Sequence, residues 1–361
     1  MNNWCSLADC NSSECHHCFP VVDCSLNHDF CQEFGPISQI HEIKRVLVTG
    51  CCGFIGSHLC ENLLKDPTIK ILGIDNINNY YSTKVKEKNL EILTAYPNFE
   101  FRKDDITTTT AISDWKPNTI CHLAGMAGVR YSVENPKLYV KVNIEGFVHL
   151  LEEAIKNNVK QITYASSSSV YGLNEKVPFS EDDPIETCNS PYACSKRAME
   201  ILAKTYTQLY DISLIGLRFF TVYGPRGRPD MAPYKFLKAI MKDEKFQKYG
   251  DGTSARDYTY IDDIVSGVVA AMNNKKKSKY GIYNLGNSSP VTLNEFIKLC
   301  EKVTNKKALY DQIENQKGDV PKTYADISKA RKDLNYNPKI SLEEGLKRTY
   351  DYLCMNQTSL R

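Results

Sequence analysis

A glycine-rich turn between an apolar run and a helical pattern is the feature that most limits how this chain can fold. The apolar run is Arg45–Thr49, the helical pattern extends from Phe54 to Leu64, and residues 50–56 read GCCGFIG. Free backbone N–H groups at such a helix N-terminus bind a pyrophosphate when no side chain stands in the way. The sequence therefore predicts a dinucleotide site that includes Gly50, Gly53, Phe54, Ile55 and Gly56.

Further apolar runs alternate with helical stretches after this turn. The runs are Ile69–Ile74, Thr119–Leu123, Gln161–Ala165 and Leu214–Phe219, and the helical stretches include Val142–Lys156 and Ser195–Tyr210. This alternation predicts an α/β fold, a Rossmann-type doubly wound parallel sheet with helices on both faces. Because turn-rich mixed patterns follow, we predict a dinucleotide-binding domain over residues 43–225, with interleaved later segments, and a smaller mixed α/β substrate-binding domain over residues 226–355.

The N-terminal residues 1–42 differ from the rest in composition. They hold six of the 14 cysteines and show no helical or strand period. The sequence CHHC at residues 15–18 could present two thiolates to zinc, but the other candidate ligands, Cys24, His28 and Cys31, lack a clean spacing. We therefore predict a disordered cysteine-rich tail and no metal site. The remaining cysteines are scattered through core-like segments, as small buried thiols.

Charge and hydropathy exclude several classes of protein. The 361 residues carry a formal net charge of +2, which gives no general attraction to nucleic acid or to an anionic membrane. No run of about 18 apolar residues is present, and the first residues lack the pattern of a signal peptide. We expect a cytoplasmic protein.

Asp75 ends the second apolar run, at the position where dinucleotide-binding proteins carry an acidic residue. A carboxylate there accepts hydrogen bonds from both ribose hydroxyls of NAD and repels the 2′-phosphate of NADP, so we predict NAD as cofactor. A role as a helix or turn cap is the alternative. The other candidate NAD contacts follow strands or lie near them: Asn76, Asp105, Ile106, Leu123, Ala124, Gly125 and Asn143.

Tyr192 and Lys196 are four residues apart at the start of a helical stretch, so both side chains lie on one face. A tyrosine has a pKa of about 10, and a nearby ammonium lowers it. We therefore expect a tyrosine general acid/base and a lysine that also reaches the nicotinamide ribose. The hydroxyls of Ser166–Ser169 end the preceding strand, where ligands bind in a doubly wound sheet. A chance match and a polar loop are the alternatives.

The motifs GCCGFIGSH, SSSSVYG, YACSK, RFFTVYGPRGRPDMA, ARDYTYIDDIV and GDVPKTYADISKA together resemble one family. From about Lys44 to Tyr352 the chain resembles the extended short-chain dehydrogenase/reductases that act on nucleotide sugars, and most of all the UDP-glucuronate 4-epimerases. The resemblance implies that Ser167 is the first catalytic hydroxyl. Related 4,6-dehydratases are expected to carry Asp and Glu where this chain has Ser168 and Ser169, and serines cannot supply that acid/base chemistry.

The resemblance also implies a mechanism. Tyr192 takes the proton of the C4 hydroxyl as C4 passes hydride to NAD, and Ser167 relays the proton. The 4-keto sugar then turns its other face to the cofactor and is reduced again. Because NAD is regenerated in every cycle, it should stay bound.

In the glucuronate branch, residues resembling Thr221 and Arg228 hold the sugar carboxylate together with Ser168 and Ser169. Oxidation at C4 creates a β-keto acid, which loses carbon dioxide readily unless its carboxylate is held out of line with the ketone. By the same resemblance, Arg256 clamps the UDP phosphates and Asp319 contacts the uridine ribose. Two departures from the branch are Met126 in place of Gln and Arg226 in place of Trp.

Three other functions stay open from the sequence. The chain could be a UDP-glucose or UDP-N-acetylglucosamine 4-epimerase, a UDP-glucuronate decarboxylase, or a non-catalytic NAD-binding scaffold or redox sensor. The intact Tyr192, Lys196 and Ser167 disfavour the last. The resemblance further implies a homodimer built through a bundle of two helices from each subunit.

Overall fold

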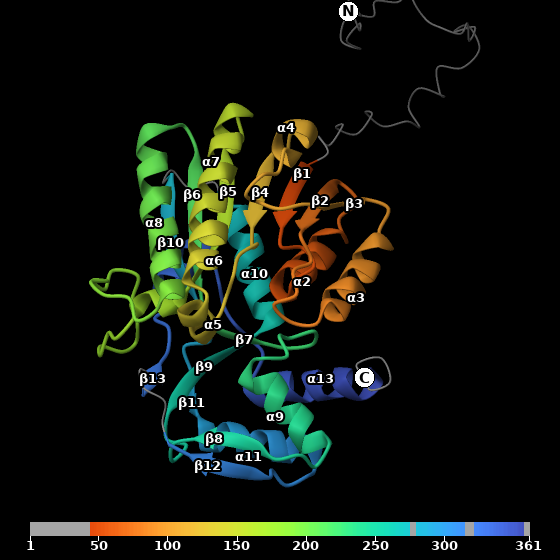
Figure 1. The fold of residues 1–361 in the computed structure, drawn as a ribbon, viewed down its shortest axis with the longest axis vertical. Coiled ribbons are helices and arrows are strands. Elements are labelled where there is room, and N and C mark those ends of the chain that lie inside the picture. The colour runs from red at the N-terminus through yellow and green to blue at the C-terminus, as the bar shows by residue number, and fades with distance from the viewer. Residues whose placement is uncertain (1–43, 275–278, 315–320, 357–361) are drawn as a thin grey trace, which may run out of the picture. The chain divides into compact units, whose positions relative to one another are not determined.

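A seven-stranded parallel sheet forms the centre of the computed structural model, which describes residues 44–274, 279–314 and 321–356 (Figure 1). The strand order is β10-β6-β5-β4-β1-β2-β3, and every neighbouring pair is parallel. The strands are β1 (Lys44–Thr49), β2 (Ile69–Asp75), β3 (Phe99–Lys103), β4 (Thr119–His122), β5 (Gln161–Ser167), β6 (Ser213–Phe219) and β10 (Tyr280–Leu285).

Helices cover both faces of this sheet, which explains why its central strands are apolar on both sides. In β1, Val46 and Val48 pack into one hydrophobic cluster, whereas Leu47 packs into another on the opposite face. The first face carries α2 (Phe54–Leu63), α3 (Thr83–Thr94) and α10 (Ile261–Met272). The second carries α4 (Ala111–Trp115), α7 (Gly146–Lys156) and α8 (Pro191–Leu209). The predicted Rossmann-type α/β fold is confirmed.

Strands β1, β2 and β3 are added toward one edge of the sheet, and β4 and the later strands are added toward the other, so β4 lies beside β1. This switch point opens a crevice at the carboxyl ends of the strands, which is where such sheets bind ligands. Short helical segments line its approach: α5 (Val129–Glu134), α6 (Pro136–Tyr139), a π-helical stretch (Val140–Glu145) that leads into α7, and a 3₁₀ turn (Ser168–Tyr171) after β5.

The later part of the chain builds a smaller mixed layer. Its strands are β7 (Thr221–Tyr223), β8 (Phe246–Tyr249), β9 (Ala255–Tyr260), β11 (Pro290–Thr292), β12 (Tyr310–Ile313) and β13 (Lys322–Thr323). Its helices are α9 (Ala232–Met241), α11 (Leu293–Thr304), α12 (Ser328–Leu334) and α13 (Leu342–Met355). Strand β10 and helix α10 also follow residue 226, yet they belong to the large sheet and its covering layer, so the chain crosses between the two parts repeatedly.

The cysteine-rich segment 1–42 and its CHHC sequence lie outside the described residues. Within the described residues, no helix is both long and apolar enough to cross a bilayer. The same part of the chain contains no group of three His, Cys, Asp or Glu side chains arranged to hold a metal ion.

A buried ion pair joins helix α8 to strand β6. Arg218 Nε and Nη2 donate to the two carboxylate oxygens of Glu200 at 2.8 and 2.9 Å, and both side chains are almost completely inaccessible. The hydroxyl of Ser166 donates to the same carboxylate at 2.7 Å. The carboxylate thus fixes α8 against the ends of both β5 and β6.

Replacing Glu200 by Ala should cost about 3–5 kcal/mol of unfolding free energy, because Arg218 would be left buried without a counter-charge. Urea unfolding at neutral pH measures this loss. Lys347→Ala, which breaks an exposed pair with Asp351, is the control and should cost less than about 1 kcal/mol. Equal losses for the two variants would contradict the structural role of the buried pair.

Candidate active site

A cavity of about 1220 Å³ lies at the carboxyl ends of the sheet strands. One wall comes from the β1–α2 turn and the ends of β2, β4 and β5, and the other from residues 219–249. Such a volume exceeds that of a typical small-ligand pocket and leaves room for two nucleotide-sized ligands. Nearly all residues that the sequence singled out line this one cavity.

The glycine turn approaches strand β4 so closely that side chains are excluded from it. Gly50 has φ +72°, and a Cβ there would lie 2.7 Å from the Ala124 nitrogen. A Cβ on Gly56 would lie 2.1 Å from the Gly50 carbonyl oxygen. Gly53 precedes the first turn of α2 and offers no side-chain cap to its N–H groups. The turn therefore presents bare backbone to the cavity, as a pyrophosphate requires.

Asp75 links the glycine turn to the end of β2. One carboxylate oxygen accepts the Cys52 N–H at 3.1 Å and the other accepts the Ile77 N–H at 2.8 Å. It caps the local turn and also borders the cavity, so the two interpretations of this residue are compatible. The other cavity-lining members of the predicted cofactor set are Phe54, Ile55, Asn76, Asp105, Ile106, Leu123, Ala124 and Gly125. Bare glycine backbone beside an acidic strand end fits an adenine dinucleotide.

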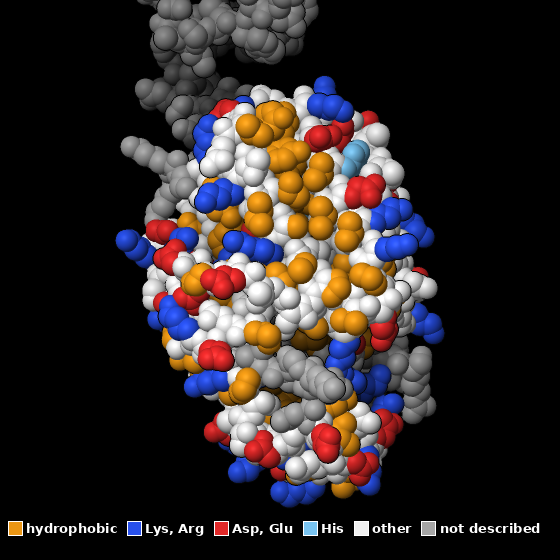
Figure 2. Space-filling view, turned by 60° about the vertical axis from the view of Figure 1, so that its left-hand side comes forward, with side chains coloured by type: hydrophobic (Ala, Val, Ile, Leu, Met, Phe, Trp, Pro, Cys, Tyr) orange, Lys and Arg blue, Asp and Glu red, His pale blue; other side chains and the backbone are white. Residues whose placement is uncertain are grey.

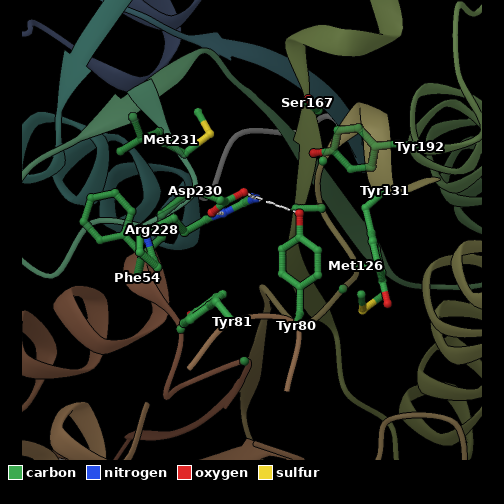
Figure 3. A pocket seen from close by; sticks show the side chains of 18 of the residues that line it. Phe54, Tyr80, Tyr81, Met126, Tyr131, Ser167, Tyr192, Arg228, Asp230 and Met231 are labelled. Atoms are coloured by element: carbon green, nitrogen blue, oxygen red, sulfur yellow. Dashed lines mark hydrogen bonds and ion pairs between the residues drawn. The ribbon is translucent and has the colours of Figure 1, made fainter. Parts of the chain in front are cut away.

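Tyr192 and Lys196 lie on the first turns of α8 and face the end of β5. Figure 3 shows Tyr192 beside Ser167 at the cavity. The helix begins at Pro191, earlier than predicted, because the Ser190 hydroxyl caps it by accepting the Ala193 N–H. The Ser167 hydroxyl lies beside the Tyr192 phenol and favours its ionised form. Because Ser167 Oγ already accepts the N–H of Ser169 at 3.1 Å, its own proton can be directed toward the phenol oxygen.

The expectation that Lys196 lowers the pKa of Tyr192 is wrong for the protein alone. Burial raises the pKa of Tyr192, and the Ser167 hydrogen bond and the charge of Arg228 offset this only in part. The Lys196 amine instead donates to the Ala165 carbonyl at 2.8 Å. Burial lowers the pKa of Lys196 to about 8. The two members of the pair are therefore both shifted toward their neutral forms.

Asn143, predicted to contact the cofactor, does not line the cavity. Its side chain is buried, and its amide accepts the Met126 N–H at 2.8 Å and donates to the Met126 carbonyl at 3.0 Å. The same amide donates to Ser195 Oγ at 2.9 Å. Asn143 thus ties the segment after β4 to α8, and both of its amide N–H groups are already used within the protein.

The predicted phosphate contact, Arg256, is not among the residues that line the cavity, and it donates to the Ala255 carbonyl at 2.9 Å. The neighbouring Asp257 accepts backbone N–H groups of residues 287, 288 and 325. Asp319 lies outside the described residues. Met126 and Arg226 are the two residues that differ from the glucuronate branch. Met126 lines the cavity. Arg226 does not line it, and its Nη2 donates to Glu61 Oε2 at 2.6 Å.

The predicted sugar contacts Ser168, Ser169, Thr221 and Arg228 line the cavity beside Ser167. Sequence reasoning missed several aromatic and charged residues among them: Tyr80, Tyr81, Arg130, Asp230 and Tyr249. The first two were signalled by the polar and aromatic stretch directly after β2, where a loop at a strand's carboxyl end reaches the crevice. The others come from segments that only the tertiary fold brings to the site.

A Rossmann-type sheet whose cavity holds Tyr192, Lys196 and a strand-end serine together defines the class of extended short-chain dehydrogenase/reductases. Residues 47–349 match the family described as GDP-mannose 4,6 dehydratase, and the chain belongs to this family.

Several relatives share most of the chain. The UDP-glucuronate 4-epimerase of Thermodesulfobacterium geofontis is 44% identical over 311 residues, which cover 85% of this chain and 95% of that one. The crystal structure of the UDP-glucuronic acid 4-epimerase from Bacillus cereus, in complex with UDP-glucuronic acid and NAD, matches with a TM-score of 0.82 and 37% identity, covering 86% and 99% of the two chains. The UDP-glucose 4-epimerase from Thermotoga maritima, solved with UDP-glucose, has a TM-score of 0.78 and 32% identity over 87% and 99%.

The lowered pKa of Lys196 has a consequence for stability. Between pH 8 and 10.5 the unfolded chain binds a proton at this lysine that the folded chain lacks, so the stability of the parent rises with pH across this window. A Lys196→Met variant has no such dependence. We expect the variant to lose about 2 kcal/mol relative to the parent between pH 7 and pH 9.5.

Urea unfolding of both proteins at the two pH values measures this change. Lys298→Met, at an exposed position of α11, is the control, and its difference from the parent should stay constant with pH. A Lys196→Met difference that is equally constant would show that this amine is not desolvated in the folded protein.

Proposed function

We propose that the chain is an NAD-dependent UDP-sugar 4-epimerase that interconverts UDP-glucuronate and UDP-galacturonate. The observation that carries the proposal is that Tyr192 and Ser167 share one cavity with Thr221 and Arg228. The first pair provides proton transfer at a sugar hydroxyl, and the second provides a hydroxyl and a cation for a carboxylate. Relatives and solved neighbours named as UDP-glucuronate 4-epimerases support the same function.

Proton transfer is assigned to Tyr192 and Ser167. In its ionised form, Tyr192 takes the proton from the C4 hydroxyl of the sugar, and the Ser167 hydroxyl donates to the oxygen on which charge develops. Ser167 is buried and Tyr192 is half-buried at the cavity wall, so a bound sugar covers both groups and keeps the transferred proton available for return. The Lys196 ammonium, fixed on the Ala165 carbonyl, lies one helical turn along the same face and adds positive charge to this site.

The cofactor is proposed to be held by the glycine turn, by Asp75 and by the small residues Leu123–Gly125 at the end of β4. NAD, when bound there, supplies the acceptor and donor of hydride for C4. Asp75 already accepts two backbone N–H groups, which hold its carboxylate in position for ribose hydroxyls. A negative group at this place disfavours the 2′-phosphate of NADP.

Loss of water from the sugar, as in a 4,6-dehydratase, is disfavoured by the residues after Ser167. A dehydratase needs an acid and a base at the C5–C6 side of the sugar, whereas the two positions after Ser167 carry only the hydroxyls of Ser168 and Ser169. Hydroxyls of this kind can instead bind a carboxylate. Roles for Arg256 at the phosphates and Asp319 at the uridine ribose stay predictions.

A UDP-glucose 4-epimerase is the second candidate, since a solved enzyme of that activity has the same fold. Arg228 argues against this activity, because a neutral sugar carries no charged group that would pair with a guanidinium at the cavity wall. UDP-glucuronate decarboxylation is the third. It would follow if the carboxylate were free to align with the C4 ketone.

Incubating the purified protein with UDP-glucuronate, with no NAD added, tests the proposal. We expect UDP-galacturonate by NMR and mass spectrometry. A UDP-pentose would mean decarboxylation, and turnover of UDP-glucose alone would favour the second candidate.

Replacing Tyr192 by Phe should lower kcat by at least about 100-fold, since the proton acceptor is lost, and should leave NAD content unchanged. Nucleotide released by heat and quantified by chromatography measures the NAD content. Tyr350→Phe, a tyrosine of α13 outside the cavity, is the control and should retain activity. Normal turnover by the Tyr192→Phe variant would refute the assigned role.

We also propose a homodimer formed through α8 and the π-helical stretch before α7. Apolar side chains are exposed along these segments: Val140, Ile201, Leu209 and Tyr210. Figure 2, which brings this side of the molecule forward, shows apolar side chains gathered along it. Exposed apolar surface on adjacent helices is the kind of face that a second copy covers.

Ile201→Glu should reduce the molar mass in solution from that of a dimer to that of a monomer, because a charge would be buried in the interface. Light scattering coupled to size-exclusion chromatography gives the mass. Met355→Glu, at an exposed apolar position near the end of α13, serves as control and should leave the mass unchanged. A parent protein that is monomeric at micromolar concentration would exclude the dimer.

A further inference from the structure

Arg228, the cation proposed to receive the sugar carboxylate, already has a carboxylate partner within the chain. Its Nε donates to Asp230 Oδ1 at 3.0 Å and its Nη2 donates to Asp230 Oδ2 at 2.5 Å. This is the bidentate arrangement that a guanidinium makes with any carboxylate, including that of a uronic acid. Both residues lie in the loop between β7 and α9 and line the cavity.

A tyrosine from the opposite wall completes the arrangement. Tyr80, in the loop after β2, accepts from Arg228 Nη2 at 3.2 Å, and its ring lies under the guanidinium at 5.4 Å. Gly128 allows this approach, since a Cβ there would lie 2.6 Å from the Tyr80 hydroxyl oxygen. Figure 3 shows Arg228, Asp230 and Tyr80 meeting in the middle of the cavity, on the side toward Tyr192.

Arg228 and Asp230 differ in how exposed their side chains are, and this difference decides which of them can lose its partner more easily. The Arg228 side chain is 19% exposed, whereas that of Asp230 is 41% exposed. Burial alone would lower the pKa of Arg228, but the hydrogen bonds and charge of Asp230 raise it. The guanidinium therefore depends on a partner, while the aspartate can turn toward solvent at little cost.

We propose that Asp230 competes with the substrate carboxylate for Arg228 and thereby sets how strongly the site prefers an anionic sugar. The inference rests on the proposed function. An incoming uronate carboxylate either displaces Asp230 from the guanidinium or shares the guanidinium with a like charge. In both cases the aspartate weakens the binding of the substrate carboxylate to Arg228.

Weaker binding of the carboxylate suits the proposed reaction. The 4-keto sugar must turn over between its two hydride transfers, so its carboxylate must leave one set of contacts and form another. When it leaves Arg228, Asp230 takes its place, and no buried guanidinium is stranded without a partner. Asp230 is in this sense a positioning residue that lowers the free-energy cost of releasing the carboxylate.

Removing the charge of Asp230 should separate binding from turnover. For Asp230→Asn we expect the Kd of UDP-glucuronate to fall by about fivefold or more, with the Kd of UDP-glucose changed less than about twofold. We expect kcat for UDP-glucuronate to fall, because the carboxylate now leaves Arg228 less readily. Calorimetric titration of the NAD-containing protein with each sugar nucleotide gives the two Kd values, and Asp230→Ala should behave in the same way.

Two controls isolate the contact with Arg228. Glu244→Gln removes another carboxylate of the cavity lining, one that pairs with Lys242, and should leave the ratio of the two Kd values unchanged. In an Arg228→Gln background, adding Asp230→Asn should no longer strengthen binding of UDP-glucuronate. A merely structural role for Asp230 would lower both affinities and would show no such dependence on Arg228.

Measurements of binding and of turnover distinguish failure of this inference from failure of the proposed function. An unchanged Kd ratio in Asp230→Asn, within a parent that epimerises UDP-glucuronate, overturns the inference alone. A parent that binds UDP-glucuronate without epimerising it overturns the proposed reaction, while the Kd ratio still decides the role of Asp230. A parent that does not bind UDP-glucuronate overturns both.

Discussion

The contact between one face of helix α8 and the last residues of strand β5 determines the geometry of the whole site. Tyr192, Lys196 and Glu200 follow one another at intervals of four residues, so they form a single stripe. Their partners are Ser167, the Ala165 carbonyl and Ser166, three consecutive strand residues. Because Glu200 is also held by Arg218 on β6, helix α8 has a fixed register against the sheet. The proposed proton transfer then lies where the strand ends and the cavity begins.

The sequence was sufficient for features that depend on periodicity and on backbone space. The alternation of strands and helices predicted the sheet, and the glycine turn could be located because only residues without Cβ fit beside β4. It was insufficient for features that depend on burial or distant partners. The direction of the Tyr192 pKa shift depends on desolvation and on where the Lys196 amine points. The contacts of Asn143 could not be predicted because its partners, Met126 and Ser195, are brought to it only by the fold.

The raised pKa of Tyr192 defines the conditions under which the phenol can act. In the protein alone, burial outweighs the help of Ser167 and Arg228, so the neutral phenol is the resting form. A buried tyrosine of this kind loses its proton more easily as positive charge accumulates in the cavity. Lys196 is poorly suited to supply all of it, because burial lowers its own pKa to about 8. Acid/base function in this site is therefore coupled to the occupancy of the cavity rather than built into the pair.

The chemistry of the sugar-facing wall follows from the need to accept two orientations of one substrate. A fixed ion pair would favour one orientation of the uronate and oppose the turn between the two hydride transfers. The hydroxyls of Ser168, Ser169 and Thr221 can donate or accept, so they can form equivalent contacts with either orientation. Arg228, a cation of this wall, is already paired with Asp230. Under the proposed function, the wall holds a carboxylate by several weak contacts that can break and form again, which restrains it from aligning with the C4 ketone while still allowing the ring to turn.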